Sequence, residues 1–131
     1  MKYLFTLYGE EGEWQEQSPE EMQAMLDPWI ALDNELREAG VFVAGEAVQP
    51  SATATTVRVE VDDQLVTDGP FAETKEQIGG FYLLDCADLD EALGWAKKVP
   101  VGAGGSIEVR PIMDFDEMPG SGAGAGVEAA S

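Results

Sequence analysis

The fold is decided by residues 67–82, which read Thr67-Asp68-Gly69-Pro70-Phe71-Ala72-Glu73-Thr74-Lys75-Glu76-Gln77-Ile78-Gly79-Gly80-Phe81-Tyr82. The Asp-Gly-Pro triplet predicts a tight turn, because Gly69 tolerates positive φ and Pro70 fixes its own φ. The paired glycines at 79 and 80 allow neighbouring backbone to come close, and residues 80–85 after them predict a strand with apolar groups on both faces. We expect residues 72–77, between turn and strand, to form a short helical turn.

Outward from this stretch, the sequence alternates between strand and helix patterns. Strands are expected at residues 2–8, 41–48 and 106–113, in addition to 80–85. Ser18 and Glu21 form a capping box for a helix that ends at Gly40, with Pro28 predicting a kink or break near Asp27. A second helix begins after the cap residue Asp88 and is predicted to bury Leu89, Ala92, Leu93 and Ala96.

Residues 56–68 are predicted to form a β-hairpin that turns at Asp62-Asp63. The alternation of its first strand predicts that Val57, Val59 and Val61 face inward, while Arg58 and Glu60 face solvent. The order is therefore strand, helix, strand, hairpin, strand, helix, strand.

The two predicted helices leave one face of the sheet without cover. Short right-handed connections place both helices on the same face. The strands are apolar on both sides, however, with Tyr3, Phe5 and Leu7 opposed by Leu4 and Tyr8. A large exposed apolar patch usually marks a partner surface, and a second copy is the simplest partner. The sequence therefore predicts a homodimer.

Length and composition set the class of protein. The 131 residues suffice for one domain, which we assign to residues 1–115, and the Gly- and Ala-rich residues 116–131 are expected to be a flexible tail. The 26 acids against 7 bases give a net charge of −19, which argues against binding nucleic acid or an anionic membrane. Without a signal peptide or a bilayer-length apolar run, the expected location is the cytoplasm.

No motif for a bound cofactor or metal is evident. Cys86 is the only cysteine, so neither a disulfide within the chain nor a cysteine metal cluster is expected. Phosphate loops, nucleotide fingerprints and nucleophile–base triads are missing from the sequence. We therefore expect no cofactor and no dedicated metal site.

Several separated motifs occur in a characteristic order: Val43-Ala44-Gly45-Glu46, Ala52-Thr53-Ala54-Thr55-Thr56-Val57-Arg58, residues 68–76, Gly79-Gly80-Phe81-Tyr82 and Ser106-Ile107-Glu108-Val109-Arg110-Pro111-Ile112. Together they resemble the DGPF-domain proteins, a branch of the YCII-related superfamily, over residues 1–113. The resemblance implies a ferredoxin-like α+β fold, paired as a dimeric α/β barrel, in which the hairpin is an insertion. It also implies a small bacterial cytoplasmic protein, often encoded beside an extracytoplasmic-function sigma factor. The histidine–aspartate pair proposed for YCII-type enzymes cannot be transferred, because this chain has no histidine.

Asp68 is the strongest candidate for chemistry. If Phe71 and Tyr82 shield it from water, its pKa would rise and suit general acid–base catalysis. The alternative is that Asp68 only caps its own turn. Glu73 is the second catalytic candidate, although it can also form a structural ion pair with Lys75 or Arg110. The residues expected to line a cleft around Asp68 are Gly45, Glu46, Gly69, Pro70, Phe71, Lys75, Tyr82 and Arg110.

Two classes of function stay open. The first is a cofactor-free enzyme or small-molecule-binding protein that uses the cleft around Asp68. The second is a non-catalytic regulatory or accessory protein that contacts a protein partner, such as a sigma factor. An open cleft with Asp68 pointing into it favours the first class, and a filled cleft favours the second.

Overall fold

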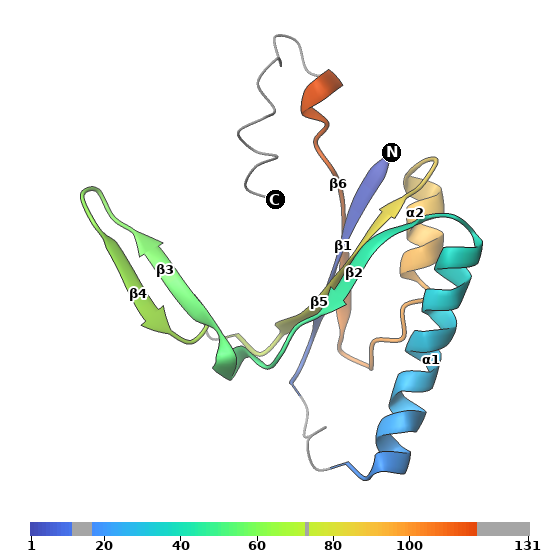
Figure 1. The fold of residues 1–131 in the computed structure, drawn as a ribbon, viewed down its shortest axis with the longest axis horizontal. Helices are drawn as coiled ribbons and strands as arrows, with labels where there is room; N and C mark the ends of the chain where they lie inside the picture. The colour runs from blue at the N-terminus through green and yellow to red at the C-terminus, as the bar shows by residue number, and fades with distance from the viewer. Residues whose placement is uncertain (12–16, 73, 118–131) are drawn as a thin grey trace.

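A computed structural model describes residues 1–11, 17–72 and 74–117 (Figure 1). Its main sheet has four antiparallel strands in the order β2-β5-β1-β6. These strands are β1 (Lys2–Gly9), β2 (Phe42–Ala47), β5 (Gln77–Asp85) and β6 (Ser106–Pro111). Helices α1 (Pro19–Glu38) and α2 (Leu89–Ala96) both lie on one side of the sheet (Figure 1). The structure is α+β, as predicted, and is compatible with a ferredoxin-like fold.

The two faces of the sheet differ in cover. On β1, Tyr3, Phe5 and Leu7 are buried beneath the helices, where they meet Leu32 and Leu36 of α1 in the hydrophobic core. Because side chains alternate along a strand, the intervening residues point the other way. We call that side the helix-free face; the strand register assigns to it Leu4, Thr6, Tyr8, Ala44, Glu46, Phe81, Leu83, Glu108 and Arg110.

Helix α1 begins and ends as its sequence predicts. The Glu21 N–H donates to Ser18 Oγ (3.1 Å), Pro19 is the first helical residue, and Gly40 follows the helix with φ of +73°. The helix runs through Pro28 without a break, so of the predicted kink or break near Asp27 the break is wrong, and the kink stays a prediction. Pro28 removes one intrahelical hydrogen bond, and on this exposed surface water can satisfy the carbonyl that is left.

Helix α2 is short and approaches the sheet through small residues. The Glu91 N–H donates to the cap residue Asp88 at 2.9 Å. Ala92 and Ala96 are buried as predicted, whereas Leu89 and Leu93 are 48% and 39% exposed. The prediction that both leucines are buried is wrong, because they lie beside the helix face on which Ala92 and Ala96 enter the core.

Strands β3 (Thr55–Val59) and β4 (Gln64–Asp68) pair only with each other and project away from the main sheet (Figure 1). We call residues 55–68 the arm. The turn lies at the predicted place, where the Glu60 N–H donates to the Asp63 carbonyl (2.8 Å). The prediction that the valines face inward is wrong, since Val57, Val59 and Val61 are 54%, 76% and 98% exposed. Alternation shows which residues share a face, but it does not show whether anything covers that face.

The segment before β5 also differs from the prediction. Residues 72, 75 and 76 form bends instead of a helical turn, and β5 begins at Gln77, paired with Gly9. Here Thr74 Oγ1 donates to the Glu76 carbonyl (2.6 Å) and Gln77 Nε2 donates to the Thr74 carbonyl (2.7 Å). These local bonds fix the bent segment directly before β5.

The C-terminal end of the domain stays a prediction. A short 3-10 turn covers Phe115–Glu117, and the predicted tail lies outside the described residues from 118 onward. Within the described ranges, no helix is long and apolar enough to cross a membrane.

Candidate functional site

A cleft of about 780 Å³ lies between α1 and the sheet. It exists because only Leu32 and Leu36 of α1 are buried, so the first half of the helix overhangs the sheet without closing on it. Helix α1 lines the cleft with Met25, Leu26, Trp29, Asp33 and Arg37. The strands and the loop before β6 complete it with Leu7, Tyr8, Gly9, Glu10, Phe42, Gly45, Glu46, Ala47, Gly79, Gly80, Phe81, Tyr82, Pro100, Val101, Gly102, Ala103 and Gly105.

Two glycines shape the floor of the cleft. A Cβ atom on Gly45 would lie 2.7 Å from Tyr82 Cδ1, and one on Gly80 would lie 2.7 Å from the Glu46 carbonyl oxygen. Any side chain at 45 would therefore collide with the Tyr82 ring, and any side chain at 80 would collide with the backbone of β2. The glycines let the ring lie across β2 and let the two strands pair closely.

Polar groups gather where the second half of α1 meets the floor. Arg37 Nε donates to Asp33 Oδ2 at 2.8 Å, and the Arg37 guanidinium lies 4.2 Å from the centre of the Phe42 ring. Burial, and to a smaller extent the negative charge of Asp33, raises the pKa of the Tyr82 phenol. A tyrosine phenol is protonated at neutral pH even at its ordinary pKa, so Tyr82 can donate a hydrogen bond.

This arrangement suits a small, largely apolar molecule. Met25, Leu26 and Trp29 supply apolar walls, while Tyr82, Asp33 and Arg37 offer a few polar groups that could orient a ligand. Binding sites for small molecules commonly combine these two elements. The phenol O–H of Tyr82 would donate to a carbonyl or hydroxyl oxygen of the ligand, and the cleft has the volume to hold a small molecule.

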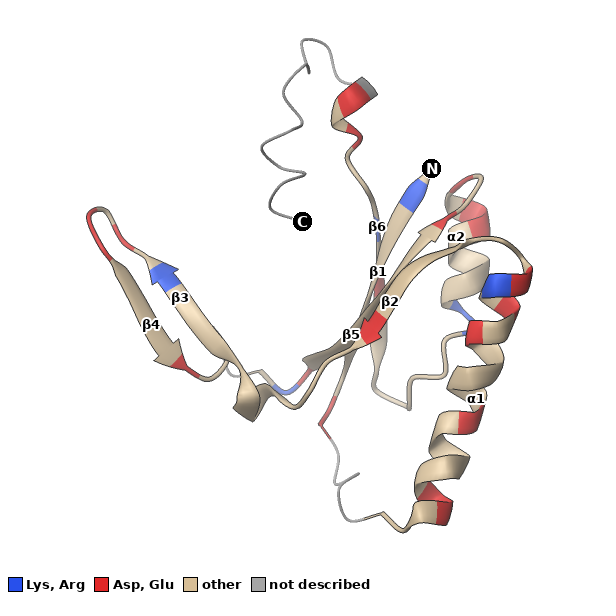
Figure 2. Cartoon of the chain, in the orientation of Figure 1, with Lys and Arg blue, Asp and Glu red and all other residues tan. Residues whose placement is uncertain are grey.

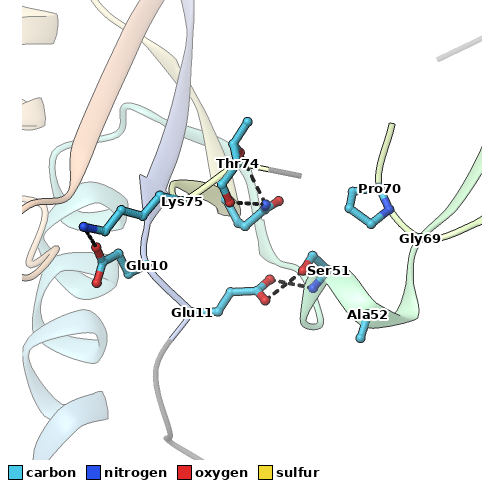
Figure 3. A pocket seen from close by; sticks show the side chains of 9 residues that line it. Glu10, Glu11, Ser51, Ala52, Gly69, Pro70, Thr74 and Lys75 are labelled. Carbon is cyan, nitrogen blue, oxygen red and sulfur yellow. Dashed lines mark hydrogen bonds and ion pairs between the residues drawn. The ribbon is translucent and has the colours of Figure 1, made fainter. Parts of the chain in front are cut away.

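A second cavity, of about 590 Å³, lies where the arm joins the sheet (Figure 3). Its carboxylates are already engaged: Glu10 pairs with Lys75 (3.2 Å), and Glu11 accepts hydrogen bonds from the Ser51 N–H and from Ser51 Oγ. The remaining lining residues are Ala52, Gly69, Pro70, Thr74 and Gln77. We interpret the Glu10–Lys75 ion pair and the hydrogen bonds from Ser51 to Glu11 as structural contacts that fix the connecting segments.

The residues predicted to form one cleft around Asp68 are divided between several places. Gly45 and Tyr82 line the cleft beneath α1, and Glu46 borders it although its side chain alternates onto the helix-free face, whereas Gly69, Pro70 and Lys75 line the second cavity. Asp68 is exposed at the end of β4, and Phe71 is 74% exposed. Arg110 lies on the helix-free face and donates to Glu108 (2.7 Å). Glu73 lies outside the described residues.

The turn itself has the predicted conformation. Gly69 has φ of +97°, its N–H donates to the Ala54 carbonyl (2.7 Å), and its own carbonyl accepts from Thr56 Oγ1 (2.7 Å). In addition, Arg58 donates to the Phe71 carbonyl at 2.7 Å. These bonds fix the base of the arm, and they place Asp68 beside a structural turn.

Sequence reasoning missed the α1 side of the cleft, namely Asp33 and Arg37 with Met25 and Leu26. A signal was present, because residues 26, 29, 33 and 37 follow helical spacing beside the buried stripe of Leu32 and Leu36. A polar pair next to a buried stripe marks the border of a helix face. Only the overhang of the helix, which depends on tertiary structure, turns that border into a cleft wall.

Comparison with known proteins gives two matches. The model of the YCII-related domain matches residues 1–116. An uncharacterized protein of Rhizobium meliloti (strain 1021) is 40% identical over 114 residues, which is 86% of this chain and 92% of that protein.

Proposed function

The chain belongs to the YCII-related domain family, and from that premise we propose that it binds a small, mostly apolar molecule in the cleft between α1 and the sheet. The observation that carries the proposal is the protonated phenol of Tyr82 at the floor of an apolar cleft, next to the Asp33–Arg37 pair. The expected ligand has an apolar body and a carbonyl or hydroxyl oxygen that accepts from Tyr82.

Stabilisation of a developing negative charge is the chemistry that this cleft could support without a cofactor. The Tyr82 O–H can donate a hydrogen bond to an oxygen on which that charge develops, while the raised pKa of the phenol disfavours the loss of its proton. Asp33 offers a carboxylate, although its bond to Arg37 holds it toward the helix. A cofactor-free enzyme and a simple binding protein share this first step, which is the capture of the ligand.

Two matched probes test the proposal. Acetophenone and α-methylstyrene have nearly the same shape, but only acetophenone has an oxygen that can accept a hydrogen bond. Titration of ¹⁵N-labelled protein, followed by NMR, should shift the amide signals of Gly45 and Gly80 and the indole N–H signal of Trp29. Acetophenone should bind about fivefold more tightly, which corresponds to one net hydrogen bond of about 1 kcal/mol.

The matched variants are Tyr82→Phe and Tyr8→Phe. Tyr82→Phe should abolish the preference for acetophenone while leaving the binding of α-methylstyrene unchanged. Tyr8 borders the cleft but alternates onto the helix-free face, so Tyr8→Phe should keep the preference. Absence of shifts at the cleft signals with both probes at their solubility limits would refute a ligand site here.

Asp68 and Glu73 stay proposed as the acid–base residues of the cleft that the sequence predicts around Asp68. Asp68 lies outside the lining of the cleft beneath α1. A contribution from Asp68 to that cleft would therefore have to come from the arm of another copy of the chain.

The homodimer and its dimeric α/β barrel are likewise proposals. They are supported by the helix-free face, on which Leu4, Phe81 and Leu83 are only partly buried within one chain. Light scattering at micromolar concentration should give the mass of two chains. Leu83→Glu should shift the protein to monomer, and a wild type that is wholly monomeric would contradict the proposal.

A second candidate function is regulation through a protein partner, for which an extracytoplasmic-function sigma factor is the proposed example. The observation that favours it is the arm, whose apolar side chains are exposed. Co-elution of the purified chain with a sigma factor encoded beside its gene would support it. Separate elution at concentrations of tens of micromolar would count against it.

A further inference from the structure

The arm exposes an apolar surface that the rest of the described chain leaves uncovered. Both of its strands are described throughout, and neither contains a buried residue. Val57 and Val66 are directly paired across the strands and are 54% and 63% exposed, and Val59 on the same face is 76% exposed. We call these three residues the valine face of the arm.

A hairpin of this kind needs support from elsewhere. Two-stranded hairpins are marginally stable on their own in water, and a third strand or a packing partner is usually required. The bonds that hold the arm, such as Gly69 N–H to the Ala54 carbonyl and Arg58 to the Phe71 carbonyl, lie within the arm and at its base. They fix how the arm leaves the body, but they do not cover the valine face.

The arm and the helix-free face border the same open region beside the sheet (Figure 1). In Figure 1 they form the two sides of a V that opens away from α1 and α2. Acidic side chains are concentrated on the helices and at the tip of the arm, whereas the strands of the arm carry only Arg58 and Asp68 (Figure 2). A chain with a net charge of −19 repels its own copies, so the strands with few charges are where self-association costs least.

We propose that the arm packs its valine face on the helix-free face of a second copy, while the partner's arm does the same in return. This proposal rests on the proposed homodimer and specifies how its interface is built. A twofold axis would place each arm in the V of the other chain, which closes the assembly at two copies. Each arm then gains the packing partner that the described residues of its own chain do not supply.

The size of the surfaces agrees with a dimer of this kind. A stable interface buries about 800 Å² on each partner, or roughly 20–30 residues a side. The helix-free face alone provides fewer residues than that. The arm adds five residues from β3 and five from β4, which together with the nine residues of the helix-free face brings the interface close to that range.

An intermolecular spin-label experiment tests the arrangement. A nitroxide is attached to Val61→Cys at the tip of the arm, where the native side chain is 98% exposed; Cys86 is buried and is not labelled. The nitroxide-bearing protein is prepared without ¹⁵N and is mixed with ¹⁵N-labelled wild type. Only the wild type then gives NMR signals, so every broadened signal reports a contact between copies. We expect broadening at the amides of Leu4, Phe81 and Leu83, and none along α1.

Two further variants make the test specific for the arm. Val66→Lys places a charge on the valine face and should weaken dimerisation at least about tenfold. Ile30→Lys makes the same change at a side chain of α1 that is 51% exposed, and it should leave dimerisation unchanged. A label at Asn34→Cys on α1 should broaden none of the three signals on the helix-free face.

The possible outcomes separate the arm from the dimer. A stable dimer without broadening on the helix-free face, or one that tolerates Val66→Lys, refutes the exchange of arms but leaves the dimer standing. A monomer at all accessible concentrations refutes both. Broadening along α1 instead of the sheet refutes the exchange and shows that the arm binds the other side of the molecule.

Discussion

The ring of Tyr82 occupies the space that a side chain at position 45 would need, since a Cβ atom on Gly45 would lie 2.7 Å from Tyr82 Cδ1 and 3.1 Å from Tyr82 Cε1. The two residues are cross-strand partners in the pairing of β2 with β5. One strand therefore supplies the phenol, and the other supplies the gap in which the phenol lies. The shape of the cleft depends on both.

Gly45→Ala tests this dependence. The methyl group must displace the Tyr82 ring, and overpacking of this kind costs about 1–3 kcal/mol. We expect a corresponding loss in the free energy of unfolding, measured with urea, and weaker binding of acetophenone.

Gly94→Ala is the matched control for Gly45→Ala. A Cβ atom on Gly94 would meet nothing within 4 Å, and Gly94 lies inside α2. Because alanine is the better helix former, this variant should be more stable by about 0.5–1 kcal/mol. Equal effects of the two substitutions would show that the Tyr82 ring moves aside without cost.

Gly69→Ala should destabilise the base of the arm. Gly69 has φ of +97°, a conformation that side chains rarely adopt, although its Cβ would have open space around it. The cost is therefore conformational and should be about 1–2 kcal/mol. If the arm unfolds separately from the sheet, hydrogen exchange should accelerate at residues 55–68 while β1 and β5 stay protected; uniform acceleration would show that both unfold together.

Asp68 gives a prediction that separates stability from function. Its side chain is exposed, so Asp68→Asn and Asp68→Ala should each change the free energy of unfolding by less than about 0.5 kcal/mol. A loss of about 1–2 kcal/mol in Asp68→Ala alone would indicate a capping role. If Asp68 acts as an acid or base in the dimer, Asp68→Asn should abolish turnover of an identified substrate while the dimer persists.

The stability of the protein should fall in alkaline solution because of Cys86. Burial, followed by the negative charges of Glu91 and Asp85, raises the pKa of this thiol from 9.0 to about 11. The folded state therefore holds the proton more tightly than the unfolded state does. This contribution is complete below pH 9 and is lost as the pH rises toward 11.

Urea unfolding of the wild type and of Cys86→Ala measures this effect. The variant has no thiol to titrate, although the lost packing lowers its stability at every pH. Between pH 8 and pH 11 the wild type should lose about 2 kcal/mol more than the variant. Parallel losses in the two proteins would place the alkaline sensitivity elsewhere.

Much of the fold was predictable because local signals determine it. The cap at Ser18, the glycine after α1 and the turn at Asp62-Asp63 depend on short-range hydrogen bonds and on φ, and all three are present in the structure. The short right-handed connections likewise predicted a sheet covered by helices on one face only. These features depend on residue type and spacing, which the sequence contains in full.

The errors concern residues whose environment depends on distant parts of the chain. Val57 and Val59 alternate as core residues do, but no other part of the described chain covers them. Asp68 and Tyr82 are close in sequence, yet the arm carries Asp68 away from the sheet that holds Tyr82. Asp33 and Arg37 were missed because their role depends on the distance between α1 and the sheet. No local pattern encodes such a separation.

The overhang of α1 has a consequence for the energetics of local opening. Leu32 and Leu36 anchor the second half of the helix, whereas Met25 and Leu26 in the first half are 38% and 41% exposed. A segment with so few buried contacts can open without global unfolding. Amide hydrogen exchange should therefore be fast from Pro19 to about Pro28 and slow beyond Leu32.

A molecule bound beneath the first half of α1 would add the contacts that this segment lacks. Closing of the helix over the cleft and capture of the ligand would then be one coupled equilibrium, in which each favours the other. Slower exchange at residues 19–28 would report occupancy of the cleft even for a ligand that has no spectroscopic signal of its own. Hydrogen exchange in the first turns of α1 would in this way detect a bound ligand.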